Sequence, residues 1–201
     1  MIVDLGTGDG RAALTLAESE PRTLAIGIDA DAASMAETSR RAARPPVKGG
    51  RPNLLFVVAA AETPPPELVG FADEIRILFP WGSLLRGVLG ADERVARGIA
   101  SLARPGGHVS AIVSVTTRDR LDGIASFDPA GLAGMAAAAQ RSGLCLTATR
   151  QADAEDIWAT RSTWGRRLLG GGSNRPVWRL DFVNDPLSTE TDARRVREPA
   201  V

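Results

Sequence analysis

The feature that most constrains this fold is the stretch ValAspLeuGlyThrGlyAspGlyArg at residues 3–11, where a short apolar segment runs into glycines at every second position. Glycine tolerates positive φ, and its missing Cβ lets a ligand approach the backbone closely. A strand that enters such a turn before a helix is typical of α/β proteins that bind nucleotide cofactors. We therefore interpret Gly6, Gly8 and Gly10 as a cofactor loop.

The rest of the chain alternates short apolar runs with segments of helical spacing, which favours an α/β fold built from βαβ units. We predict one domain over residues 1–183, with a seven-stranded sheet, and a flexible polar tail over 184–201. The predicted strands are 1–5, 23–28, 53–58, 74–79, 108–115, 144–149 and 177–183. The predicted helices are 11–18, 32–43, 92–102, 129–142 and 153–169.

Composition narrows the class of protein. The formal net charge is zero, which argues against sequence-blind adhesion to nucleic acid. The single cysteine, Cys145, lies in an apolar LeuCysLeu run, so we expect a core residue of a protein from a reducing compartment. We find neither a signal peptide nor an apolar run of membrane-spanning length, and we expect a monomeric cytoplasmic protein without a metal site.

Two carboxylates narrow the cofactor class. Asp29 ends the second predicted strand, where it can accept hydrogen bonds from two ribose hydroxyls. The dinucleotide fingerprint is G-x-G-x-x-G, whereas this chain has G-x-G-x-G with Asp4 two residues ahead of it. Asp4 would repel a pyrophosphate but can pair with a cationic amino group. The combination resembles the motif of S-adenosylmethionine-dependent methyltransferases, and AlaAlaAlaGlu at 59–62 places Ala61 and Glu62 where this fold holds the adenine ring.

PheProTrpGly at 79–82 ends the fourth predicted strand, where the fold holds the methyl-accepting atom. Phe79 cannot hold an exocyclic amino group, so we favour a ring nitrogen as the nucleophile. Such a nitrogen needs no general base if it is unprotonated, and catalysis then comes from orientation. Trp81 and a second tryptophan, Trp164, can clamp an extruded purine.

Trp164 and the arginines near it can also have purely structural roles. Trp164 can be a helix core residue, and the nearby arginines can form a solvated face rather than contact phosphates. We assign Trp158 and Trp178 to packing. The candidate RNA-binding residues lie in two segments and are Lys48, Arg51, Arg166, Arg167 and Arg175.

Five segments together resemble the aminoglycoside-resistance 16S rRNA methyltransferases that modify N1 of adenine 1408. They are residues 4–11, 46–53, 59–62, 79–90 and 162–168, of which PheProTrpGlySerLeuLeu is the most specific. The resemblance implies a Rossmann-like class I methyltransferase with a mostly parallel sheet, acting on 16S rRNA in the assembled 30S subunit.

The resemblance also implies roles for individual residues. Those that would bind S-adenosylmethionine are Asp4, Gly6, Asp29, Ala61 and Glu62. Those that would line the cofactor and target pocket are Pro80, Ser83 and Ser162. Trp81 and Trp164 would stack on the flipped adenine, and Arg167 and Arg175 would touch the RNA.

The sequence departs from the family in two places. Family members carry an N-terminal β-hairpin and leading strand before the glycine motif, with no counterpart in this sequence, and residues 116–131 match poorly. Two alternatives therefore stay open: a small-molecule methyltransferase on the same scaffold, and a cofactor-binding homologue with weak or no rRNA methylation.

Overall fold

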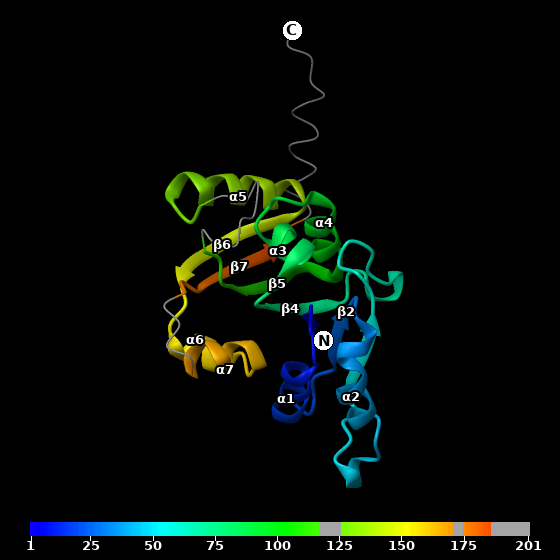
Figure 1. Ribbon diagram of the computed structural model, residues 1–201. Helices are drawn as coiled ribbons and strands as arrows, with labels where there is room; N and C mark the ends of the chain where they lie inside the picture. Colours follow the sequence, from blue (N-terminus) through cyan, green and yellow to red (C-terminus); the bar gives the residue numbers. More distant parts are fainter. Residues whose placement is uncertain (117–125, 171–174, 186–201) are drawn as a thin grey trace.

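The computed structural model describes residues 1–116, 126–170 and 175–185 (Figure 1). The strands are β1 (Ile2–Leu5), β2 (Ala25–Asp29), β3 (Leu54–Val58), β4 (Ala72–Leu78), β5 (Ala103–Val113), β6 (Leu144–Gln151) and β7 (Trp178–Asn184). The α-helices are α1 (Arg11–Ser19), α2 (Ala32–Ala42), α3 (Gly82–Val88), α4 (Glu93–Leu102), α5 (Pro129–Arg141), α6 (Ala154–Ala159) and α7 (Thr163–Gly170). Two 3-10 turns, η1 (Pro46–Lys48) and η2 (Pro66–Leu68), precede β3 and β4.

The strands form one sheet in the order β3-β2-β1-β4-β5-β7-β6. The first five strands in this order are parallel, and β7 runs antiparallel to both β5 and β6. This confirms the predicted seven-stranded, mostly parallel sheet. The carboxyl ends of the five parallel strands meet at one edge, called the carboxyl edge below, where open α/β sheets bind their ligands.

Helices cover both faces of the sheet. Figure 1 shows α3, α4 and α5 on one side, and α1, α2 and the α6–α7 pair on the other. The alternation along β1 explains the division, since Val3 and Leu5 join the cluster under α3–α5 whereas Ile2 packs with α1. A third, smaller cluster joins Ile112 of β5 to Ile157 of α6.

Aspartates begin four of the helices. Asp31, Asp92, Asp128 and Asp153 each accept a hydrogen bond from a backbone N–H of the first turn, which satisfies a donor that the helix itself leaves unpaired. The helices are short, and within the described ranges none is long and apolar enough to cross a bilayer.

The largest difference from the prediction concerns residues 153–169, which form two helices rather than one. The break falls at Arg161, whose φ is +53°. The Thr160 hydroxyl accepts a hydrogen bond from Ser162 N, and the Ser162 hydroxyl accepts one from Gly165 N. These local side-chain bonds compete with the helical pattern and start a new helix at Thr163. The structure also contains α3, a helix that the sequence analysis did not predict.

Three further predictions were wrong. Cys145 is exposed on β6, an edge strand of the sheet, rather than buried in the core. Trp158 is 53% exposed, so packing does not account for it, whereas Trp178 packs on the core and stacks on Phe127 as expected. Asn184 belongs to β7 and is buried, so the predicted tail begins too early; its remainder, from residue 186, lies outside the described residues.

Candidate active site at the carboxyl edge

The glycine loop is attached to the end of β2 by hydrogen bonds. The N–H groups of Gly6 and Thr7 both donate to the Ile28 carbonyl, at 2.8 and 3.0 Å. Gly8 N donates to Asp29 Oδ2 at 2.8 Å, and the other carboxylate oxygen accepts from Asp31 N. The carboxylate predicted to hold a ribose therefore also fixes the loop beside it.

Two of the loop glycines are required for different reasons. Gly8 has φ +56°, and a Cβ built there would meet no atom within 4 Å, so the loop is open on that side. Gly10 also has a positive φ, but its Cβ would lie 2.6 Å from the Phe56 ring. Gly8 therefore leaves room for a ligand, as a cofactor cradle requires, whereas Gly10 allows close packing at the start of α1.

Asp4 is a buried carboxylate on the face of β1 that α1 covers. Its side chain is 3% exposed and accepts a hydrogen bond from the Thr7 hydroxyl at 2.6 Å. Burial raises the pKa of Asp4 from 3.8 to about 6, against the opposing effects of Thr7 and of the Arg76 charge. An ionised Asp4 would therefore gain from a cationic ligand group.

The loop after β3 brings the predicted adenine-binding residues to the same edge. Ala61 is buried and Glu62 is half-buried. A Cβ at Gly98 of α4 would lie 1.8 Å from the Ala61 carbonyl oxygen, so only glycine lets α4 approach this loop. That close contact fixes the backbone of the loop at the carboxyl edge.

Trp81 is exposed at the end of β4, as predicted. Phe79 has φ +50°, an uncommon conformation for a bulky residue, and it turns the chain sharply after the strand. After the half-buried Pro80, Trp81 is the N-cap residue of α3, with 86% of its surface exposed, and Ser83 lies exposed in the first turn. A large flat side chain in this position has no packing role within the described residues.

Trp164, on α7, lies beside Phe79 at the end of β4. Its ring lies 5.0 Å from that of Phe79, centroid to centroid, at an angle of 39°. The Arg175 guanidinium lies 5.8 Å from the Trp164 ring centre and also bonds to Ser114. Phe79 thus connects the two tryptophans predicted to form a clamp, since it touches one and precedes the other by two residues.

A hydrogen bond that the sequence analysis missed joins α7 to the glycine loop. The Thr163 hydroxyl donates to Asp9 Oδ2 at 2.9 Å. Asp9 lies inside the predicted cofactor motif, but no sequence signal pairs it with a residue so distant in the chain. The adjacent Ser162, predicted as a pocket residue, is half-buried and caps α7.

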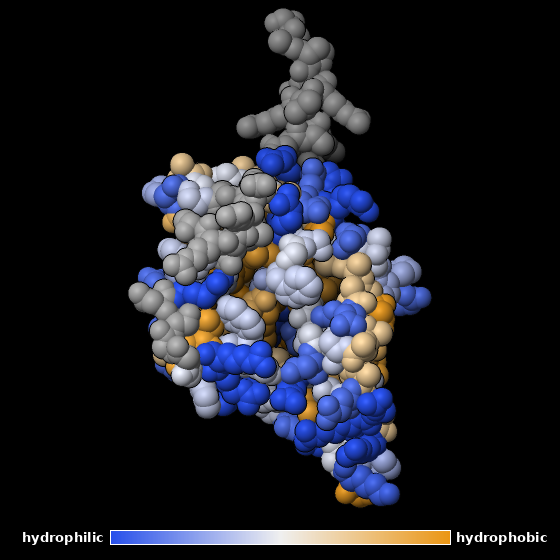
Figure 2. Space-filling view, in the orientation of Figure 1, coloured by the Kyte–Doolittle hydropathy of each residue, from blue (hydrophilic) through white to orange (hydrophobic). Residues whose placement is uncertain are grey.

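The predicted RNA-binding residues fall into two separate groups. Arg166 and Arg167 are exposed on α7 near Trp164. Lys48 and Arg51 lie beyond the far end of α2, at the opposite edge of the sheet, where hydrophilic residues cover the surface (Figures 1 and 2). Arg51 pairs with Glu18 at 2.8 Å and donates to the Gly50 carbonyl, so it also stabilises its own loop.

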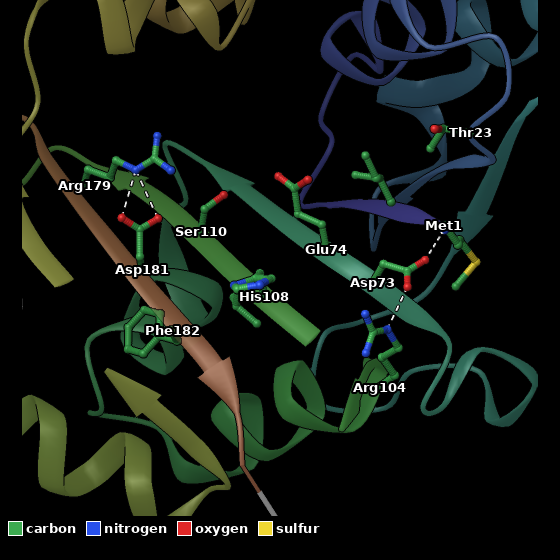
Figure 3. A pocket seen from close by; sticks show the side chains of 12 residues that line it. Met1, Thr23, Asp73, Glu74, Arg104, His108, Ser110, Arg179, Asp181 and Phe182 are labelled. Atoms are coloured by element: carbon green, nitrogen blue, oxygen red, sulfur yellow. Dashed lines mark hydrogen bonds and ion pairs between the residues drawn. The ribbon is translucent and has the colours of Figure 1, made fainter. Parts of the chain in front are cut away.

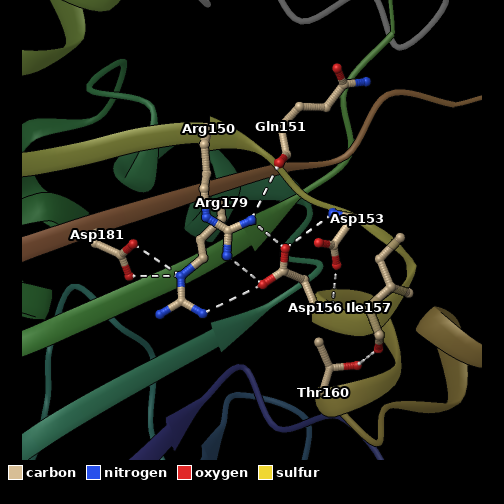
Figure 4. A network of polar contacts seen from close by, with 8 residues as sticks. All are labelled: Arg150, Gln151, Asp153, Asp156, Ile157, Thr160, Arg179 and Asp181. Atoms are coloured by element: carbon tan, nitrogen blue, oxygen red, sulfur yellow. Dashed lines mark hydrogen bonds and ion pairs between the residues drawn. The ribbon is translucent and has the colours of Figure 1, made fainter.

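A second group of charged side chains lies on the sheet face between α1 and α6. Two cavities, of about 500 and 290 Å³, open there and share Glu74, Ser110 and Arg179 in their walls (Figure 3 shows the first). We call the residues of this region the polar sheet face: Glu74, Arg76, Ser110, Arg150, Asp156, Arg179 and Asp181. Its charges pair with one another, as Figure 4 shows for Arg179, which contacts Asp181 and Asp156.

Metal ligands do not cluster in the part of the chain that the structure describes. Over residues 1–116, 126–170 and 175–185, no group of three or more His, Cys, Asp or Glu side chains has a geometry that could hold an ion.

Comparisons with known proteins agree with this geometry. A family model named NpmA, described as 16S rRNA (adenine(1408)-N(1))-methyltransferase, matches residues 1–182. A protein of that description from Streptoalloteichus hindustanus is 37% identical over 173 residues, covering 84% of this chain and 80% of its own. Another from Escherichia coli is 35% identical over 179 residues, with the same coverage.

Solved structures show the same fold. The 16S rRNA methyltransferase KamB superposes with a TM-score of 0.83 at 34% identity, covering 92% of this chain and 87% of its own. A tryptophan-to-alanine mutant of the 16S rRNA (adenine(1408)-N(1))-methyltransferase from Catenulisporales acidiphilia, solved with its cosubstrate SAM, gives a TM-score of 0.81 at 33% identity and covers 99% of this chain and 88% of its own.

Proposed function

Because this chain belongs to the family of 16S rRNA (adenine(1408)-N(1))-methyltransferases, we propose that it methylates N1 of adenine 1408 within the assembled 30S subunit. The methyl donor is S-adenosylmethionine. The observation that carries the proposal is the meeting of an open glycine loop and two exposed tryptophans at one edge of the sheet.

The chain's residues fit the donor. Asp29 lies where it can bind the ribose hydroxyls, and its contact with Gly8 N holds the loop in place. Ala61 and Glu62 would contact the adenine ring of the cofactor. Asp4 would pair with the ammonium group of the cofactor, which would compensate the charge of this buried carboxylate. Ser83 and Ser162 line the remaining wall of the pocket.

The acceptor adenine leaves its helix and stacks between Trp81 and Trp164. Stacking of this kind is worth roughly 1–3 kcal/mol per base, independent of base identity, and leaves the ring edge free. When bound, S-adenosylmethionine would supply a sulfonium methyl group to the N1 lone pair with its own sulfur as the leaving group, and because N1 carries no proton no general base would be required. Pro80 and Phe79 orient the ring, and catalysis comes from the in-line placement of N1.

Contacts to the RNA backbone place the base for this step. Arg166, Arg167 and Arg175 surround Trp164, where they can bind phosphates next to the flipped nucleotide. Lys48 and Arg51 provide a second contact at the opposite edge. A large ribonucleoprotein surface can reach both groups, which favours an assembled subunit over a small molecule as the substrate.

The test is methyl transfer from radiolabelled S-adenosylmethionine to purified 30S subunits, followed by reverse transcription. We expect a stop at adenine 1408 with intact subunits and little transfer to protein-free 16S rRNA. Subunits carrying guanine at position 1408 are the matched control and should accept no methyl group. A stop at another nucleotide, or full activity after Arg166→Ala and Arg167→Ala together, would contradict the proposal.

Methylation at this position also predicts a cellular effect. Expression of the chain in a susceptible bacterium should raise the inhibitory concentration of aminoglycosides that bind the decoding site. The Trp81→Ala variant should not, at equal expression.

A further inference from the structure

The hydrogen bond from Thr163 to Asp9 joins the two halves of the candidate site, and we propose that it couples cofactor binding to the placement of Trp164. The Thr163 hydroxyl donates to Asp9 Oδ2 at 2.9 Å, and the two residues are 154 positions apart. Thr163 is then a positioning residue. The inference rests on the proposed function in one respect, since it takes Trp164 as a surface for the target base.

The Asp9 end of this bond belongs to the cofactor loop. Asp9 lies between Gly8, whose N–H is held by Asp29, and Gly10, which begins α1. Its carboxylate Oδ1 accepts from Arg11 N at 3.1 Å, and its backbone carbonyl accepts from the Thr38 hydroxyl. A ligand that orders the loop therefore also orders the Asp9 carboxylate, which is the acceptor for Thr163.

The Thr163 end belongs to a helix with little burial of its own. Gly165 is the one buried residue of α7, whereas Arg166, Arg167 and Leu169 are exposed. A helix with so few buried contacts lies at the low end of local stability. Leu168 packs on the Ile112–Ile157 cluster, and the Phe79 ring lies 5.0 Å from that of Trp164. The hydrogen bond at the first residue of α7 therefore acts with these two contacts to hold Trp164 in place.

The geometry predicts reciprocal effects. If S-adenosylmethionine orders the glycine loop and, through Thr163, fixes α7, a base stacks better on Trp164 in the cofactor-bound protein. By linkage, the subunit then raises affinity for the cofactor by the same factor. Thr163→Val keeps the shape of the side chain but removes the hydroxyl that donates the hydrogen bond to Asp9. Because the Asp9 side chain is 45% exposed, water can replace the lost bond, and the variant should fold normally.

The first experiment needs no RNA. In a background with Trp81, Trp158 and Trp178 changed to Phe, Trp164 is the remaining tryptophan, and its emission is followed as S-adenosylmethionine is added. We expect a change in emission that Thr163→Ser retains and Thr163→Val loses, with a dissociation constant by calorimetry that differs by less than about twofold. The inference is overturned if Thr163→Val shows the same change in Trp164 emission, or if adding the cofactor does not change the emission of the parent background.

The second experiment measures turnover on 30S subunits with the full tryptophan set. Thr163→Val should lower kcat/KM for the subunit about 5- to 10-fold and, by the same linkage, raise KM for S-adenosylmethionine when subunit is saturating, whereas Thr163→Ser should restore most of both. Asp9→Ala combined with Thr163→Val should be no worse than Asp9→Ala alone, because both remove one interaction. A parent protein that binds the cofactor and moves Trp164 but leaves the subunit unmethylated refutes the proposed function and not this coupling.

Discussion

Charged side chains cluster both at the carboxyl edge and on the polar sheet face, but the kinds of partner that they contact differ. At the carboxyl edge, the two carboxylates predicted to bind the cofactor accept from neutral donors: Asp29 from Gly8 N and Asp4 from the Thr7 hydroxyl. On the polar sheet face, charges bind opposite charges, as in the pairs Arg179–Asp181 and Arg150–Asp156.

This difference separates a binding edge from a structural network. A carboxylate held by neutral groups keeps its charge for an incoming cation, whereas one in an ion pair is already neutralised. The cavities of about 500 and 290 Å³ open on the polar sheet face, and Asp4 also lines the smaller one, but the Arg179, Asp156 and Asp181 charges in their walls already pair with one another. The partners of each charge, rather than the cavity volumes, are therefore the reason for proposing the carboxyl edge as the binding site.

The largest expected effect comes from removing the Asp4 charge. Asp4→Asn should weaken S-adenosylmethionine binding about 30-fold or more, because removing one partner of a buried charge pair costs about 2–5 kcal/mol. The same change should stabilise the ligand-free protein at neutral pH, since the buried carboxylate is no longer ionised there. Calorimetry and urea denaturation measure the two effects. Equal cofactor affinity in the variant would remove Asp4 from the site.

The pH dependence of stability gives an independent test of the same group. Burial raises the pKa of Asp4 to about 6 from 3.8, so between these values the folded protein keeps a proton that the unfolded chain has released. The contribution of Asp4 to the free energy of unfolding therefore falls as pH rises through this window and is constant above it. Asp4→Asn should abolish this contribution. Cofactor affinity of the parent protein should fall below about pH 6, as Asp4 becomes protonated.

The next effect concerns the tryptophans. Trp81→Ala and Trp164→Ala should each lower kcat/KM for the subunit about 5- to 150-fold, which corresponds to the loss of roughly 1–3 kcal/mol of stacking. Affinity for S-adenosylmethionine should change less than about threefold. Phe71→Ala is the matched control, because Phe71 is also exposed but precedes β4 at the opposite edge. If either tryptophan variant lost cofactor affinity as strongly as turnover, the stacking role would be wrong.

On the polar sheet face we expect an effect on stability alone. Asp156→Ala leaves Arg150 and Arg179 without this partner and should cost roughly 1–3 kcal/mol of unfolding free energy, with cofactor affinity unchanged. The bond from Arg150 lowers the pKa of Asp156, so this stabilisation is present at neutral pH and is lost as pH falls below about 4.

The matched control for Asp156 is an exposed ion pair. Glu93→Ala removes the partner of Arg97 on α4, where both side chains are more than half exposed, and should cost at most a few tenths of a kcal/mol. Chemical denaturation measures both variants. A loss of cofactor affinity in Asp156→Ala would show that the two regions are not independent.

The smallest effect concerns Arg76, a charge of the polar sheet face that also acts on Asp4. Arg76 pairs with Glu74 at 2.7 Å, and its field lowers the pKa of Asp4 against the effect of burial. Arg76→Met should raise the pKa of Asp4 further and weaken cofactor binding about twofold near pH 6, with a smaller effect at higher pH. Glu74→Gln is the control and should leave the midpoint of the pH profile unchanged. The measurement is cofactor affinity as a function of pH.

Much of the carboxyl edge could be predicted because each strand carries its own local signal. Asp4, Gly8 and Asp29 follow or end apolar runs, and parallel strands bring such ends together without further information. Cys145 and Trp158 show the limit of this reasoning. Cys145 lies in an apolar run, but its strand is at the edge of the sheet. Trp158 lies in a helical segment, but that helix packs on the sheet through Ile157. The exposure of both residues depends on which elements lie beside them, and the local sequence does not contain that information.

The sequence by itself determined the sheet, the glycine loop and the two exposed tryptophans, because hydrophobic period, glycine and aromatic type act within a few residues. Only the tertiary structure decided that residues 153–169 break at Arg161 and that α7 returns to the loop through Thr163 and Asp9. A hydroxyl and a carboxylate so far apart in the chain have no pattern that pairs them. They meet because β7 runs antiparallel beside β5 and the α6–α7 pair packs beneath it, which is a property of the assembled sheet.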